Sequence, residues 1–107
     1  MASNTEQRFD AAMMNIYHRA RKEAGYNATR YLQMLHDQGG LGTAQTLLHA
    51  RQVSEGYTAL WERKRLELTV EALVLQPEWR ELFTPEELDI ARQRLQQYGH
   101  QVPATGS

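Results

Sequence analysis

The clearest local pattern in this chain is the start of a helix at Thr84, Pro85, Glu86 and Glu87. Thr84 can cap the first turn, Pro85 loses no hydrogen bond at the first helical position, and Glu87 can reach back to complete a capping box. Apolar residues then recur at helical spacing before a glycine suited to a left-handed helix end: Leu88, Ala91, Leu95, Tyr98 and Gly99. The pattern predicts a helix over residues 85–98, and no motif of comparable strength indicates chemistry.

The first half of the chain predicts three more helices. Apolar spacing over residues 5–24 indicates an amphipathic helix that stops at Gly25. Asn27 is expected to cap a second helix, which ends at the pair Gly39-Gly40. A short third helix is then expected to begin with Thr43 as its cap.

The second half continues the same organisation. Ser54 is a candidate cap for a further helix. Residues 66–71 alternate like a strand but also match a helix, and we favour the helix because no partner strand is visible and a lone strand cannot satisfy its backbone. Pro77 then starts a short turn that leads to Phe83.

These elements predict an all-α fold, a single domain of five or six short helices around one core. Its 107 residues leave no room for a second core. We expect residues 1–99 to form the domain and residues 100–107 to form a flexible C-terminal tail. Both tryptophans, Trp61 and Trp79, lie on the apolar stripe of their segments and are predicted to be buried.

Composition restricts the setting. The chain has no cysteine, which excludes disulfides and thiolate metal sites and favours a reducing compartment. Its start is polar, and its longest purely apolar run covers only residues 72–75. These features predict a cytoplasmic protein without a signal peptide or membrane partner.

The usual signatures of an enzyme do not appear. The histidines never stand three to five residues apart, so no helix presents a paired metal site: His18, His36, His49 and His100. The glycine-rich stretch 39–43 lacks the Lys-Ser/Thr ending of a phosphate loop, and we interpret it as a turn between helices. We therefore expect no catalytic residue, no cofactor and no metal site.

Basic residues form two candidate nucleic-acid contacts. One group surrounds the Gly25 turn, close to two tyrosines, and the other is a triplet: Arg19, Arg21, Lys22 and Arg30, then Arg63, Lys64 and Arg65. Basic side chains beside aromatic ones are typical of nucleic-acid binding. Residues 27–52 also have the scale of a helix-turn-helix. An acidic second half and a formal net charge of −1 argue against this function.

Five segments together resemble a widespread family of small all-helical bacterial proteins of uncharacterised function. The resemblance covers roughly residues 15–98 and rests on residues 26–32, 39–48, 56–62, 66–75 and 77–88. It implies a bacterial source and a cytoplasmic setting, and it carries no activity, cofactor or site residue.

The sequence favours a non-enzymatic protein-binding or adaptor module that acts through a helical surface. The alternative is a nucleic-acid-binding accessory protein with a basic face near residues 19–30. A nucleic-acid binder should gather its basic side chains on one continuous face, whereas an adaptor should expose apolar surface. The sequence leaves homo-oligomer formation open.

Overall fold

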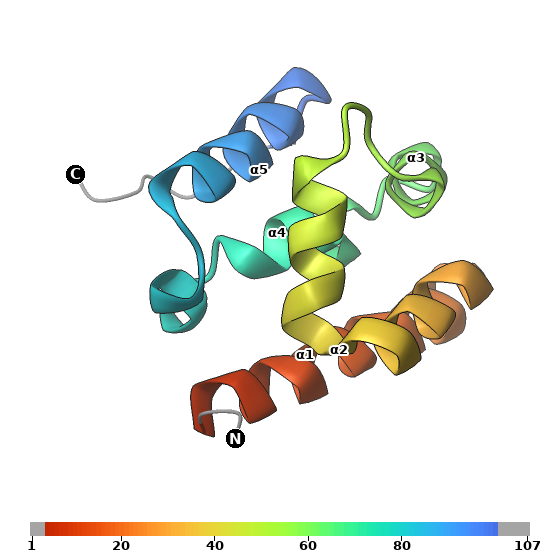
Figure 1. Cartoon of the computed structure of the whole chain (residues 1–107). Coiled ribbons are helices and arrows are strands. Elements are labelled where there is room, and N and C mark those ends of the chain that lie inside the picture. The colour runs from red at the N-terminus through yellow and green to blue at the C-terminus, as the bar shows by residue number, and fades with distance from the viewer. Residues whose placement is uncertain (1–3, 101–107) are drawn as a thin grey trace.

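The computed structural model describes residues 4–100, which fold as one all-α unit (Figure 1). In chain order its elements are α1 (Asn4–Glu23), α2 (Thr29–His49), α3 (Glu55–Glu62), η1 (Leu66–Leu68), α4 (Val70–Val74), η2 (Pro77–Leu82) and α5 (Pro85–Gln97). The predicted fold class is confirmed. The segment that could have been strand or helix is helical in two pieces, η1 and α4, with Thr69 extended between them. Thr69 caps α4 by accepting a hydrogen bond from the Ala72 amide at 3.1 Å.

Two long helices frame the core. In Figure 1, α1 and the first half of α2 lie side by side along the bottom, and the second half of α2 turns upward toward α5, with α4 behind it. Phe9 of α1 packs edge-on against Trp79 and Phe83, with ring centroids 5.3 and 5.4 Å apart. Trp79 is buried, as predicted.

Two helix starts follow the sequence. The Ser54 hydroxyl accepts a hydrogen bond from the Tyr57 amide at 3.0 Å. At α5 the capping box is complete: Glu87 N–H donates to Thr84 Oγ1 at 3.2 Å, and Thr84 N–H donates to Glu87 Oε1 at 2.9 Å. Both are local features, so the sequence predicted them correctly.

The middle of α2 agrees with the prediction in part. The helical backbone is interrupted at Gly39, as predicted, with φ 75° and ψ 176°, but the second half of α2 begins directly after it rather than at Thr43 and continues to His49. Asp10 of α1 accepts a hydrogen bond from the Gly40 amide at 2.7 Å and so caps the second half of α2. A Cβ atom on Gly40 would lie 3.0 Å from Asp10 Cα, so glycine permits this approach.

Two of the predicted helix caps, Thr43 and Asn27, are wrong. Thr43 is not a cap; it is fully buried within α2. Residues 27–52 have the scale of a helix-turn-helix, but the two halves of α2 meet directly at Gly39, and the Gly40 amide at the start of the second half donates to the Asp10 carboxylate. Asn27 does not cap α2 either, because its side-chain oxygen accepts a hydrogen bond from the Tyr17 hydroxyl at 3.0 Å.

Helices α3 and α5 end in the same hydrogen-bond pattern. Arg65 N–H donates to Leu60 O and His100 N–H donates to Leu95 O, both at 2.8 Å. The preceding residues, Lys64 and Gly99, adopt left-handed backbones with φ 59° and 80°. His100 therefore belongs to the end of α5, whereas the rest of the predicted tail, residues 101–107, lies outside the described residues.

Candidate functional site

Trp61 is the exposed large apolar side chain of the described region, with 45% of its surface accessible. The prediction that it belongs to the core is wrong. The buried face of α3 is formed by Tyr57 and Leu60, and Trp61 lies at the edge of that face. A large aromatic side chain left in solvent identifies this part of the molecule as a candidate contact surface.

Trp61 is held in place by other aromatic rings. It packs edge-on against Tyr98, with centroids 5.4 Å apart, and Tyr98 packs edge-on against Tyr57 at 5.1 Å. Tyr57 is buried, and its hydroxyl donates to the backbone oxygen of Arg94 at 3.0 Å. This aromatic row of Tyr57, Tyr98 and Trp61 connects the exposed ring to the core and restricts its motion.

A groove lies between the ends of α3 and α5 beside Trp61. It has a volume of about 240 Å³ and is lined by Trp61, Lys64, Leu66, Tyr98, Gly99 and His100. We call it the α3–α5 groove. Among the described residues its ionisable lining consists of Lys64, His100 and the phenol of Tyr98, without a carboxylate. The groove therefore combines aromatic and aliphatic side chains with the ammonium group of Lys64.

The structure brings the two predicted basic groups together at the end of α1. Glu23 accepts hydrogen bonds from Arg19 at 2.8 Å and from Arg65 at 2.6 Å. Arg63 donates to the backbone oxygen of Ala24 at 3.0 Å. These contacts join α1 to the segment that follows α3, so they have a clear structural role.

Part of the basic charge in this region is neutralised. Hydrogen bonds from Arg19 and then Arg65 lower the pKa of Glu23 to about 2, which keeps this carboxylate ionised. Arg65 also pairs with Glu67 at 2.6 Å. Arg63 lies over the ring of Tyr26, 5.4 Å from its centroid. Three of the seven predicted contact residues thus have partners within the chain.

The other four predicted contact residues are exposed: Arg21, Lys22, Arg30 and Lys64. Within residues 4–100 their side chains form no hydrogen bond or ion pair. Arg21 and Lys22 lie in the last turn of α1, and Arg30 lies in the first turn of α2. These cations are available to an external ligand.

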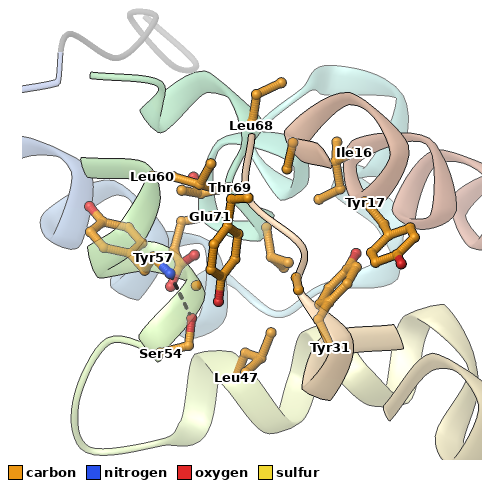
Figure 2. A pocket seen from close by; sticks show the side chains of 15 residues that line it. Ile16, Tyr17, Tyr31, Leu47, Ser54, Tyr57, Leu60, Leu68, Thr69 and Glu71 are labelled. Carbon is orange, nitrogen blue, oxygen red and sulfur yellow. Dashed lines mark hydrogen bonds between the residues drawn. The ribbon is translucent and has the colours of Figure 1, made fainter. Parts of the chain in front are cut away.

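A second concave feature is a small cavity inside the molecule. Figure 2 shows Tyr17 and Tyr31 on one side of it and Tyr57 and Glu71 on the other. Its volume is about 40 Å³, which suits one or a few water molecules, since one water needs roughly 10–15 Å³ by this measure. The Tyr31 hydroxyl donates to the Met13 backbone oxygen at 2.8 Å. Burial raises the pKa of Tyr31 and of Tyr57, so both phenols are neutral.

The carboxylate at this cavity belongs to a buried ion pair. Glu71 is 2% exposed and lies 3.0 Å from Arg94 Nη1. Arg94 also donates to the backbone oxygens of Leu47 at 2.9 Å and Ala50 at 2.6 Å, which ties the end of α2 to α5. Burial raises the pKa of Glu71 despite the nearby guanidinium. We interpret this arrangement as structural, because its guanidinium is committed to the fold.

Sequence reasoning missed several of these residues. Glu71 is followed by apolar residues three and four positions later, at Val74 and Leu75. Arg94 has Ala91 three positions before it and Tyr98 four positions after it. Both charged residues therefore lie on otherwise apolar helical faces. That pattern could have indicated a buried pair. His100 gave no comparable pattern, because its position at the groove depends on where α5 ends.

Neither a metal site nor a membrane span is formed by the described residues. Within residues 4–100, no three His, Asp or Glu side chains are grouped so as to hold a metal ion. In the same part of the chain, no helix is long and apolar enough to cross a membrane.

Comparisons with known proteins give no relative: no family model, no curated protein and no solved structure matches this chain. The predicted bacterial family therefore stays a prediction, and the argument for function rests on the geometry of the molecule.

Proposed function

We propose that this protein is a non-enzymatic binding module that recognises a partner protein through the surface around Trp61. The observation that carries the proposal is a tryptophan that is 45% exposed yet backed by Tyr98 and Tyr57. Tryptophan is enriched among the few residues that dominate binding energy at protein interfaces. A ring already held by its neighbours loses little conformational freedom on binding, which favours affinity.

The rest of the chain agrees with a role in binding. The interior cavity is too small for an organic substrate, and its carboxylate is paired with Arg94. A bacterial source and a cytoplasmic setting belong to the same proposal and derive from the sequence.

One observation favours nucleic acid as a second candidate ligand. The two basic groups meet at the end of α1, and four of their members have no partner within residues 4–100: Arg21, Lys22, Arg30 and Lys64. Phosphate contacts by these cations would make binding strongly salt-dependent. We rank this function second because Glu23 and Glu67 hold Arg19 and Arg65.

The test compares two variants that separate the candidates. Trp61→Ala removes the exposed ring, and the triple variant Arg21→Glu, Lys22→Glu, Arg30→Glu reverses the unpaired charge near α1. Each is immobilised with the wild-type protein and exposed to nuclease-treated lysate of the source organism. The captured protein is then purified and titrated by calorimetry.

We expect a purified partner that binds the wild-type protein and the triple variant but loses most of its affinity for Trp61→Ala. Binding to a short oligonucleotide that weakens steeply with salt and disappears in the triple variant would instead support the second candidate. A partner that binds Trp61→Ala as well as the wild-type protein would refute the proposal.

A further inference from the structure

We infer that the α3–α5 groove binds an acidic peptide segment of the partner, with a carboxylate at Lys64 and a neighbouring apolar side chain against Trp61. The inference rests on the proposed function and adds the chemistry of the ligand.

The charges at the groove complement an anion. Lys64 lines it, and no carboxylate of residues 4–100 does. The nearest acidic residues along the chain are Glu62 and Glu67, neither of which lines the groove, and Glu67 is bound to Arg65. The Lys64 ammonium, which has no side-chain partner within the described residues, is therefore available to a carboxylate from outside.

The helix ends at the groove do not cancel this charge. The last turn of a helix carries partial negative charge on its free carbonyl oxygens. Here several of these oxygens already accept hydrogen bonds, from the Lys64, Arg65, Gly99 and His100 amides and from the Arg63 side chain. A carbonyl oxygen that already accepts a hydrogen bond is stabilised less by a nearby cation. Neutralising the end of the helix therefore does not explain why a lysine stands at position 64.

The backbone of Lys64 supports a role for its side chain. Lys64 occupies the left-handed position after α3, and Gly99 occupies the equivalent position after α5. Glycine is the usual residue there because a Cβ atom disfavours the conformation. The chain thus has a lysine where a glycine would be more stable, which is expected when the side chain serves a ligand.

The distance along the chain between Trp61 and Lys64 sets the form of the ligand. Lys64 N–H donates to the Trp61 backbone oxygen at 3.0 Å, so both residues belong to one tight turn. A ligand that contacts both must carry its acidic and apolar side chains close together. A short peptide segment can do this, and its carboxylate would form a charge-assisted hydrogen bond with the ammonium group.

The test uses short random peptides displayed on phage and selected on the full-length protein. Selected peptides are synthesised with a fluorophore and titrated by anisotropy, each beside an analogue with Asn or Gln in place of Asp or Glu. The variants are Trp61→Ala, Lys64→Glu and Lys64→Gly. The last relaxes the backbone, so it removes the charge without endangering the fold. Lys22→Glu is the matched control, because Lys22 is an unpaired lysine at the end of α1 outside the groove.

We expect selected peptides to place Asp or Glu within a few positions of an aromatic residue or leucine. Lys64→Glu should weaken their binding roughly tenfold or more, as for close charge pairs at interfaces. Lys64→Gly should weaken it less, and Lys22→Glu should leave it unchanged. The amide analogues should bind the wild-type protein weakly and show no further loss with Lys64→Gly.

Other outcomes overturn the inference in distinguishable ways. Peptide binding that requires Trp61 but not Lys64 refutes the acidic ligand and leaves the proposed function standing. Failure to enrich any peptide over the Trp61→Ala control refutes the groove as a peptide site, whereas the purified partner decides the proposed function separately.

Tighter peptide binding after removal of residues 101–107 would support the peptide site, with the chain's own end as a competitor for it. Two other occupants would overturn the inference. Binding of a short oligothymidylate that is lost in Trp61→Ala and Lys64→Gly indicates nucleic acid. A dimer seen by light scattering and lost in Trp61→Ala indicates a second copy of the protein.

Discussion

Replacement of Lys64 by glycine should make this protein more stable, although it removes a charged side chain from a helix end. Lys64 has φ 59°, and it is the residue other than glycine with a positive φ in the described part of the chain. The appropriate reference is Lys64→Ala, because both variants lose the ammonium group and only the glycine relieves the backbone.

The magnitude follows from two opposing effects. A left-handed backbone costs roughly 1–2 kcal/mol for a residue with a Cβ atom. Glycine gives back about 0.4–1 kcal/mol because it increases the conformational entropy of the unfolded chain. Lys64→Gly should therefore exceed Lys64→Ala in free energy of unfolding by about 0.5–1 kcal/mol. For a domain of this size that corresponds to a midpoint about 2–6 °C higher.

The assay is thermal and urea unfolding followed by circular dichroism, with two reverse substitutions as controls. Gly25 and Gly99 have φ 66° and 80°, and a Cβ atom at either position would meet no atom within 4 Å. Alanine there tests backbone strain without a clash, so Gly25→Ala and Gly99→Ala should each be destabilising by a similar amount. If Lys64→Gly is no more stable than Lys64→Ala while both controls lose stability, Lys64 is not strained and this step of the ligand argument fails.

Five further substitutions test the fold and the site. Trp79→Ala should lower the free energy of unfolding by roughly 3–5 kcal/mol because the ring is buried. Trp61→Ala should change it by less than about 1 kcal/mol because the ring is exposed. Equal losses of the two variants in urea unfolding would contradict this difference in burial. Arg94→Leu should lower it by about 3–5 kcal/mol because a buried carboxylate loses its ion-pair partner, and a thermal midpoint like that of the wild-type protein would disprove this role. Thr84→Ala should lower it by about 0.5–2 kcal/mol through loss of the cap and should leave partner binding intact, which calorimetry can check. Burial alone would raise the pKa of Glu87, but hydrogen bonds from the Thr84 backbone and from His49 lower it below the ordinary value of 4.5. The ionised Glu87 therefore stabilises the fold above about pH 4.5, and this contribution to the free energy of unfolding is lost as the pH falls through the lowered pKa. The stability difference between the wild-type protein and Glu87→Gln should consequently narrow on acidification, and a difference that stays constant down to acid pH would rule out this linkage.

The parts of the fold that the sequence predicted correctly depend on nearby residues. Thr84 and Glu87 are three positions apart, and their capping box needs no other element. Ser54 and Tyr57 form a similar local pair. The helical period of α1 likewise appears in its own sequence. Such features can be derived from one segment because the interacting groups belong to it.

The parts that failed depend on distant residues. The second half of α2 is capped by Asp10, 30 positions before Gly40, so its start could not be placed from the local sequence, which suggested Thr43 instead. Glu23 is shared between Arg19 on its own helix and Arg65, 42 positions away. The apolar spacing of α3 correctly predicts the buried Tyr57 and Leu60, but it cannot show whether another helix covers Trp61 at the edge of that face. That depends on how α5 packs against α3.

The contact between Asp10 and Gly40 also bears on how this molecule opens. The Gly40 amide, at the start of the second half of α2, donates to the Asp10 carboxylate of α1. The second half of α2 therefore loses this cap whenever α1 separates from it. Amide protons of residues 43–49 should therefore exchange with solvent in the same opening events that release α1, although the two segments are far apart in sequence. The bend makes these segments one cooperative unit, whereas the first half of α2 can fray from its own end.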